Sequence, residues 1–247
     1  MYEGTMYDVR RRVLGLLLIV FSMTLSAQDF AADRELMNAY LTDDMPAWKA
    51  HIDAQRNDVQ CTKDLLYEYG YCGYIVAEAK KEGKEALLPE AKQYVAQFRK
   101  HVEGQNGKLP PGHYEMYMSA VYVYELRLKE SIHPLKAMSL AKDAVKKAPK
   151  DPLVLSYYGT CLFYAPKPFG DKKEALQLFL RAEEKFSGAE WKECWWRAAA
   201  MMYIAQCYDK KGDTSEAVRQ CKKILKEYPD YAFIRDTYLP GLLERMR

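Results

Sequence analysis

Four histidines are the side chains of this chain best suited to ligate a metal or move a proton. His51, His101, His113 and His133 stand far apart, and no H-E-x-x-H or similar metal spacing joins them. The chain also lacks a G-x-S-x-G nucleophile motif, a Walker A phosphate loop and a G-x-G-x-x-G dinucleotide loop. The sequence therefore predicts no catalytic residue, no metal site and no bound cofactor, and an enzyme ranks behind two binding functions.

Six cysteines offer a second kind of chemistry, the formation of disulfides or redox centres. None of them has C-x-x-C spacing, which argues against a zinc knuckle and a thioredoxin-type centre. Buried free thiols are the expected state, because cysteine is among the most buried residue types. An oxidising compartment would also allow bridges, and the best candidate pair is Cys207 with Cys221, on the two helices of one predicted hairpin.

Tyrosine is the most unusual part of the composition, with 20 copies against 8 Phe and 4 Trp. Its apolar ring and polar tip suit half-buried helix interfaces and ligand grooves. Trp195 and Trp196 are adjacent on a predicted helix, so their rings point about 100° apart. We therefore expect one to pack inward and the other to be exposed. Packing in the core and at an interface is the favoured interpretation, and a carbohydrate platform is the alternative.

The charges of the chain are nearly balanced, with a formal net charge of +3. Lysines gather near predicted helix ends, as at Lys146, Lys147 and Lys150, where cations complement the helix dipole. Nucleic-acid binding requires a concentrated basic stripe, which this distribution does not provide. We accordingly expect no nucleic-acid partner.

Residues 1–27 have the order of a secretory signal peptide. Arg10 to Arg12 form a basic segment, Val13 to Phe21 is apolar apart from one glycine, and small or polar residues follow up to Ala27. The apolar stretch is shorter than the roughly 20 residues that a membrane-spanning helix needs. We expect cleavage after Ala27 and a periplasmic or secreted protein without stable membrane insertion; an uncleaved anchor is the alternative.

Apolar residues recur at helical spacing through the rest of the chain, and no strand pattern is convincing. The predicted class is all-α. Aspartates mark predicted helix starts at Asp151, Asp171 and Asp213, the last two with glutamate three residues later. The predicted divisions are capping helices over 28–60, a hairpin over 61–104, three hairpins over 113–230 and a C-terminal capping helix over 231–247.

Residues 113–230 contain a repeated pattern of small and large residues. The copy over 118–151 carries Leu128, Ala137, Ala144 and Pro149, and the next begins 34 residues later at Pro152 with Tyr158, Gly159, Ala175 and Ala182. The copy over 198–230 carries Ile204, Ala205, Tyr208, Gly212, Ala217, Ile224 and Pro229. This pattern resembles the tetratricopeptide repeat, whose period is about 34 residues. The resemblance implies an α-solenoid of antiparallel helical hairpins wound into a right-handed superhelix.

Two departures from the repeat pattern affect these copies. Glu125 stands where the family usually has Gly or Ala, which leaves the crossing of that helix pair open. In the second copy, Gly159 and Ala175 are separated by a loop insertion at residues 165–168. The hairpin over 61–104 resembles a degenerate fourth copy with Gly73, Ala91 and Phe98.

The resemblance also implies a concave groove lined by residues of each first helix. The matching positions here are Tyr122, Leu126, Lys129, Ser156, Thr160, Phe163, Met202, Gln206 and Asp209. Their mixed chemistry suits a protein or peptide held by apolar and amide contacts better than an acidic C-terminus. The leading hypothesis is an exported scaffold for protein–protein interaction; the alternative is an accessory subunit of an envelope complex that binds through convex or terminal faces.

Overall fold

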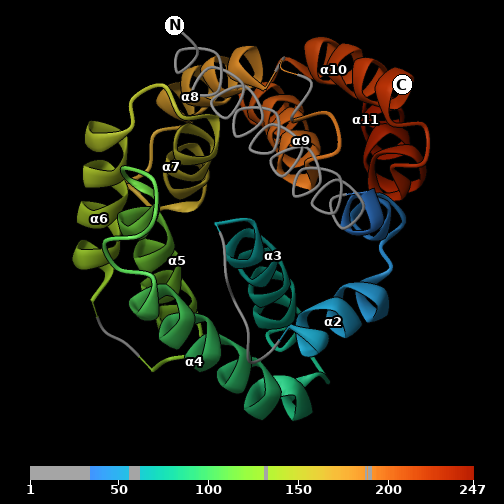
Figure 1. Ribbon diagram of the computed structural model, residues 1–247. Coiled ribbons are helices and arrows are strands. Elements are labelled where there is room, and N and C mark those ends of the chain that lie inside the picture. The colour runs from blue at the N-terminus through green and yellow to red at the C-terminus, as the bar shows by residue number, and fades with distance from the viewer. Residues whose placement is uncertain (1–33, 56–61, 131–132, 187, 189–190) are drawn as a thin grey trace, which may run out of the picture.

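The computed structural model of the chain describes residues 34–55, 62–130, 133–186, 188 and 191–247. These residues form helices joined by short loops, and no strand occurs among them. The all-α solenoid expected from the sequence is thus confirmed (Figure 1). The predicted signal peptide over 1–27 lies outside the described residues.

The helices follow one another as a short N-terminal pair, four hairpins and a C-terminal segment. A helix over 34–42 is followed by α2 (Met45–Ala54). The hairpins pair α3 (Thr62–Glu78) with α4 (Leu88–Gly104), α5 (His113–Arg127) with α6 (Pro134–Lys147), α7 (Pro152–Tyr164) with α8 (Lys172–Lys185), and α9 (Trp195–Lys210) with α10 (Thr214–Glu227). A 3-10 turn, η1 (Glu85–Leu87), precedes α4, and the chain ends with the π-helix η3 (Phe233–Tyr238) and α11 (Leu239–Arg245).

Aspartate side chains start three of these helices, as the sequence predicted. The Asp151 carboxylate accepts a hydrogen bond from the Val154 amide at 3.0 Å and so caps α7. Asp171 and Asp213 cap α8 and α10 in the same way. Each cap satisfies a backbone N–H that has no partner inside its helix.

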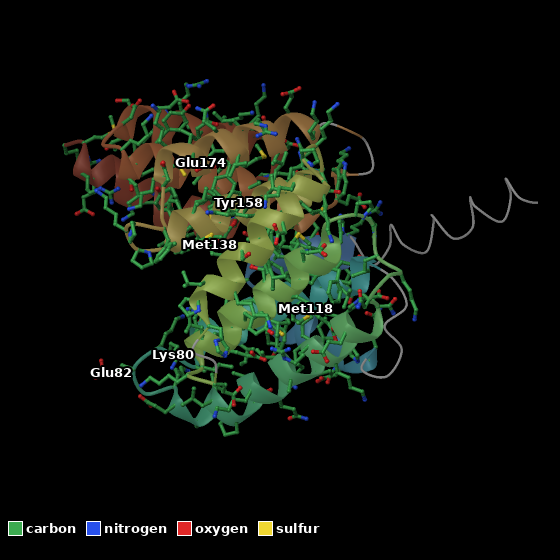
Figure 2. The ribbon with its side chains drawn as sticks, turned by 90° about the vertical axis from the view of Figure 1, so that its left-hand side faces the viewer. Lys80, Glu82, Met118, Met138, Tyr158 and Glu174 are labelled. Carbon is green, nitrogen blue, oxygen red and sulfur yellow. The ribbon has the colours of Figure 1, made fainter. Side chains whose placement is uncertain are left out.

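The four hairpins form two layers of helices. Each helix packs on the next, and α3, α5, α7 and α9 also contact one another in succession. These first helices make the inner layer, and α4, α6, α8 and α10 lie outside them (Figure 1). Figure 2 shows the stack from the side, with Met118, Met138, Tyr158 and Glu174 following one another from α5 to α8.

Small residues mark the places where paired helices come closest. A Cβ added to Gly159 would lie 3.0 Å from the Phe179 ring of α8, so glycine allows this approach. In α5 this role belongs to Ser119, whose hydroxyl donates to the Ala137 carbonyl of α6 at 2.7 Å. Glu125 instead turns away to Arg99 of α4, with N–O distances of 2.7 and 2.8 Å. The departure at Glu125 is therefore compatible with a close helix pair.

The N-terminal helices close the array against its far end. The Tyr40 and Tyr231 hydroxyls are 2.5 Å apart, and Arg34 forms an ion pair with Glu193 at 3.1 Å. In Figure 1 the blue helix over 34–42 accordingly lies beside the orange and red helices of the C-terminal third. Residues from both ends of the chain thus share one core.

Candidate functional site

Tyr122, the first predicted groove residue, faces the outer layer of helices. Its ring lies under the Arg99 guanidinium of α4, 5.0 Å from the ring centroid, and under the Lys136 ammonium of α6 at 4.5 Å. These cations hold the ring between two outer helices. Leu126 is 37% exposed, and Lys129 lies beyond the end of α5 with a φ of 62°. The three positions of this repeat therefore do not share one inner surface.

The predicted groove positions of α7 are largely buried. Ser156 has no exposed surface, so it is a core residue in this structure and cannot contact a ligand there. Thr160 is half-buried and donates to the Ser156 carbonyl at 3.0 Å. Phe163 is buried with its ring centroid 5.7 Å from that of Tyr203 on α9. Close packing of adjacent inner helices buries side chains that the resemblance assigned to ligand binding.

In α9 the C-terminal segment contacts two of the three predicted groove positions. The Tyr231 hydroxyl donates to the Met202 sulfur at 3.3 Å. Asp209 accepts a hydrogen bond from Arg245 at 2.8 Å and another from Tyr238 at 3.2 Å. Gln206 is half-buried. Met202 and Asp209 therefore have partners within the chain, and the binding roles of the nine positions stay predictions.

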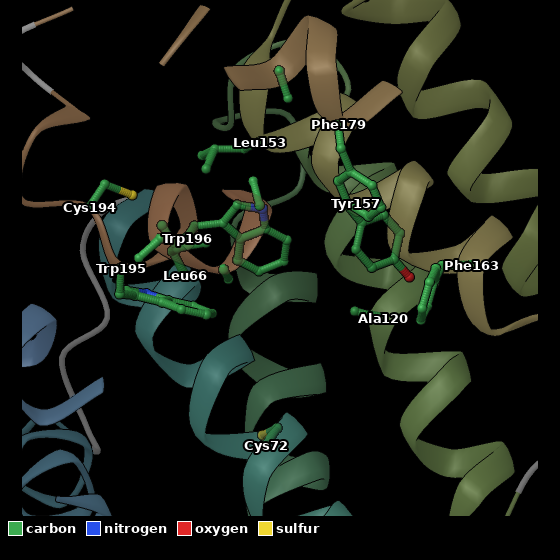
Figure 3. Packing of buried hydrophobic residues seen from close by; sticks show 14 of the residues in the cluster. Leu66, Cys72, Ala120, Leu153, Tyr157, Phe163, Phe179, Cys194, Trp195 and Trp196 are labelled. Atoms are coloured by element: carbon green, nitrogen blue, oxygen red, sulfur yellow. The ribbon is translucent and has the colours of Figure 1, made fainter. Parts of the chain in front are cut away.

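Aromatic side chains fill the interior where α3 and α9 meet. The Tyr69 ring of α3 lies 4.4 Å from Trp196 and 6.4 Å from Trp195, measured between centroids. The two tryptophans are 7% and 4% exposed, so the expectation of one exposed indole is wrong (Figure 3). Because α9 packs against α3 as well as against its neighbours, both sides of its first turn are covered, and there is no tryptophan platform for a carbohydrate.

Gly70 allows the indoles of Trp48 and Trp195 to approach α3. A Cβ at this position would lie 2.6 Å from the Trp48 ring and 2.8 Å from the Trp195 ring. The two rings are themselves 5.1 Å apart in an edge-to-face arrangement. A side chain at position 70 would therefore displace the contact between the N-terminal helices and α9.

Four tyrosines from four different elements lie around this aromatic core. They are Tyr40 of the helix over 34–42, Tyr69 of α3, Tyr164 at the end of α7 and Tyr203 of α9, and we call them the inner tyrosine face. Tyr164 is 65% exposed, and the other three are half-buried. The Tyr164 and Tyr203 ring centroids are 6.0 Å apart. Tyr40 and Tyr69 both contact Trp195, at 5.3 and 6.4 Å.

Burial and neighbouring phenols both shift the pKa values of three of these tyrosines. Burial is the main cause that raises the pKa values of Tyr40, Tyr69 and Tyr203. The Tyr164 phenol raises all three pKa values further, and Tyr40 and Tyr69 both act on Tyr203. These hydroxyls are therefore neutral near pH 7 and can donate as well as accept hydrogen bonds.

The cysteines that the structure describes are free thiols. Cys207 and Cys221 are free and have no exposed surface, so the candidate bridge between them is absent. They pack as small apolar residues, which is the buried free state that the sequence predicted. Cys161 is half-buried beside Tyr69 and Tyr157, and burial raises the pKa of its thiol to about 12. A thiol of this pKa is protonated at neutral pH and is a poor nucleophile.

Within the described ranges, no group of three or more His, Cys, Asp or Glu side chains could hold a metal ion. None of the described helices is long and apolar enough to cross a membrane. What the inner tyrosine face offers is neutral aromatic surface with hydroxyl groups.

Sequence reasoning did not find these four tyrosines as a group. Tyr40 belongs to a predicted cap, Tyr69 to the degenerate hairpin, and Tyr164 ends the helix before the inserted loop. The high tyrosine content was the available signal, but a repeat register aligns positions within hairpins and cannot bring separate elements together.

Comparison with known proteins identifies one segment of the chain. A family model of the tetratricopeptide repeat matches residues 199–231, which include most of α9 and all of α10. The match falls on the third of the three repeats expected from the sequence. No curated protein matches the chain.

Proposed function

We infer that this chain, a tetratricopeptide-repeat protein, is an interaction scaffold that holds an extended segment of a partner protein on its inner tyrosine face. Repeat arrays of paired helices bind through extended surfaces built from successive repeats. The proposal assigns that surface to Tyr40, Tyr69, Tyr164 and Tyr203 in place of the nine positions inferred from the resemblance.

The observation that carries the proposal is the convergence of four phenols from four separate elements. Packing already fixes their rings, as for Tyr203, which stacks on Phe179 at 5.1 Å with an interplanar angle of 11°. Rigid aromatic side chains give a large contact area at a low cost in conformational entropy, and their hydroxyls bond to peptide groups. The surface therefore suits a segment that supplies apolar groups and backbone carbonyls.

Binding to defined peptides tests this function. Tyr164→Ala removes the most exposed ring of the face, and we expect about 10-fold or greater loss of affinity for peptides selected from a random library. Tyr122→Ala is the matched control, because it removes the same side chain from a position of α5 that faces the outer helices. Equal effects of the two variants, or an effect of Tyr122→Ala alone, would contradict the proposal and favour the groove inferred from the resemblance.

We further propose that the scaffold acts outside the cytoplasm. The supporting feature is the basic, apolar and small-residue order of residues 1–27. N-terminal sequencing of the mature protein should then begin at Gln28. A mature protein that begins at Met1 or Met6 would contradict cleavage.

A second function, assembly into a larger complex, is favoured by the C-terminal segment. Phe233, Leu243 and Met246 of this segment are large apolar side chains that are 40%, 41% and 50% exposed, as side chains at an interaction site can be. If this end docks on a larger partner, a Phe233→Ser, Leu243→Ser double variant should lose that association. The same variant should bind library peptides normally, which separates the two functions.

A further inference from the structure

We propose that Asn106 is a modification site, at which the backbone nitrogen of Gly107 converts the asparagine into aspartate and isoaspartate. Both residues belong to the turn that follows α4 and precedes α5. The proposal combines the order of these two residues, their exposure and the hydrogen bonds of the turn. It goes beyond the proposed function and does not depend on it.

The reaction needs no reagent other than water. The Gly107 nitrogen attacks the side-chain carbon Cγ of Asn106 and loses its proton, while the side-chain nitrogen leaves as ammonia. Water then opens the five-membered succinimide ring that has formed. Opening at Cγ gives aspartate, and opening at the main-chain carbonyl carbon of Asn106 gives isoaspartate, in which the backbone runs through the former side chain.

Glycine after asparagine removes the steric barrier to this attack. Gly107 has no Cβ beside its nitrogen, and its φ of 75° lies in the left-handed region that glycine adopts readily. A Cβ built at this position meets nothing within 4 Å, so the ring would form in open space. Asn106 and Gly107 are both exposed, which gives water access to the ring.

The nitrogen that attacks is not engaged elsewhere. The Asn106 amide donates to the Glu103 carbonyl at 3.2 Å. The Lys108 amide donates to the Gln105 carbonyl at 3.0 Å. Within the described part of the chain, the Gly107 amide between them has no acceptor, and the Asn106 side chain has no hydrogen-bond partner. Attack by the Gly107 nitrogen therefore breaks no hydrogen bond.

Asn38 is an internal control for the same chemistry. It is also exposed, but it lies inside the helix over 34–42 and is followed by Ala39. The methyl group of Ala39 hinders attack by its nitrogen, and a nitrogen within a helix donates to a carbonyl of the preceding turn. The third asparagine of the chain, Asn57, lies outside the described residues.

The isoaspartyl product should loosen the link between α4 and α5. It adds one methylene group to the backbone inside the turn that the Lys108 amide closes on the Gln105 carbonyl. Both products also place a negative charge just beyond the C-terminus of α4, where the helix dipole disfavours it.

Incubation of the folded full-length chain at pH 6 and pH 8 tests the proposal. Mass spectrometry of proteolytic peptides follows the replacement of the side-chain NH2 by OH, and chromatography separates isoaspartyl from aspartyl peptides. We expect Asn106 to react at least about tenfold faster than Asn38, because the helix must open locally before Ala39 can attack. The rate at Asn106 should rise about tenfold per pH unit, since the deprotonated fraction of an amide rises that way below its pKa.

Variants and a reference peptide make the outcome decisive. Gly107→Ala should slow the reaction at Asn106 at least about tenfold, because it restores a side chain beside the attacking nitrogen. A synthetic peptide of residues 103–110 gives the rate without the fold. Equal rates at Asn106 and Asn38, or an unchanged rate in Gly107→Ala, would overturn the proposal. So would aspartate without isoaspartate at Asn106, or a reaction at least about tenfold slower in the protein than in the peptide, because the turn would then protect the site.

Hydrogen exchange tests the effect on the turn. Asn106→Asp carries the charge without the extra methylene group and is the matched control. Amides of residues 105–112 should exchange faster in the incubated protein than in Asn106→Asp. Equal exchange in the two proteins would contradict the loosening of the turn by isoaspartate.

Discussion

At the scale of single residues, Gly70 decides whether the two ends of the chain can share a core. A methyl group there would lie within 3 Å of both Trp48 and Trp195, too close for atoms in contact. We expect Gly70→Ala to lower the free energy of unfolding by about 1–3 kcal/mol, the usual cost of overpacking a dense core. Urea unfolding followed by circular dichroism measures this change.

Gly104→Ala is the matched control for Gly70. Gly104 ends α4, and nothing lies within 4 Å of a Cβ built on it. Alanine there should be neutral or slightly stabilising, since it restricts the unfolded chain. A Gly70→Ala protein as stable as the Gly104→Ala protein would show that the indoles can move apart without cost.

The reactivity of Cys161 tests how strongly burial protects this thiol. Its pKa of about 12 means that alkylation by iodoacetamide at pH 8 should be about a thousandfold slower than for an ordinary exposed thiol. The rate should rise about tenfold per pH unit while the fold persists, because the thiolate fraction rises that way below the pKa. Mass spectrometry follows the label, with Cys161→Ala as the control. Rapid, pH-independent labelling at neutral pH would contradict burial of this thiol.

At the scale of elements, Asp151 joins two neighbouring hairpins. Its carboxylate caps α7 and also lies 3.0 Å from His113 Nε2 at the start of α5. Asp213 caps α10 in the same way and serves as the control, since a cap alone is worth about 1 kcal/mol. Asp151→Ala should destabilise the protein by about 1 kcal/mol more than Asp213→Ala, because the partner histidine loses its bond.

The same carboxylate should make stability depend on pH. Burial acts to raise the pKa of Asp151, but the His113 bond and charge and the backbone amides outweigh it and lower the pKa. A lowered pKa in the folded state means that the contribution is present above the ordinary value near 4 and is lost as pH falls through the folded value. The stability gap between wild type and Asp151→Ala should therefore narrow in acid. A gap that widens below pH 4 would contradict this assignment.

The elements themselves were largely predictable from the sequence, because their signals are local. Asp151, Asp171 and Asp213 correctly predicted helix starts, and Gly159 belongs to the repeated pattern of small and large residues. The rotation of each helix about its axis was not predictable in the same way. Tyr122 was assigned to the groove by register, yet Arg99 and Lys136 turn it outward through contacts with other helices. Such contacts depend on how hairpins cross, which a repeat pattern does not encode.

At the scale of the whole molecule, closure between the two ends distinguishes this array from an open solenoid. The Tyr40–Tyr231 contact joins residues 191 positions apart, and Trp48 meets Trp195 beside it. A repeat of about 34 residues predicts contacts between neighbouring hairpins. It does not predict these two pairs, because their elements are not neighbours in the array. Closure also explains why the inner surface near α3 is filled by the chain's own rings.

Closure should change how the array unfolds. In an open solenoid each repeat contacts only its neighbours, so the ends can fray independently. Here Trp195 touches Trp48, Tyr40 and Tyr69, so the N-terminal helices cannot detach without exposing the α9 core. Amides of residues 34–55 should therefore exchange with deuterium nearly as slowly as those of the central helices. We expect Trp195→Ala to cost about 3–5 kcal/mol and to accelerate exchange over 34–55 and η3 far more than in α6.

Phe186→Ala tests whether faster exchange over 34–55 in the Trp195→Ala protein reflects lost contacts between the two ends or a general loss of stability. Phe186 has no exposed surface and packs on Trp191, whose ring centroid is 5.4 Å away. Its truncation should cost a similar free energy, because a comparable ring leaves the core. It should not single out residues 34–55 for faster exchange. If both variants accelerate exchange over 34–55 equally, the N-terminal helices respond to global stability alone and the contacts across the array do not couple its ends.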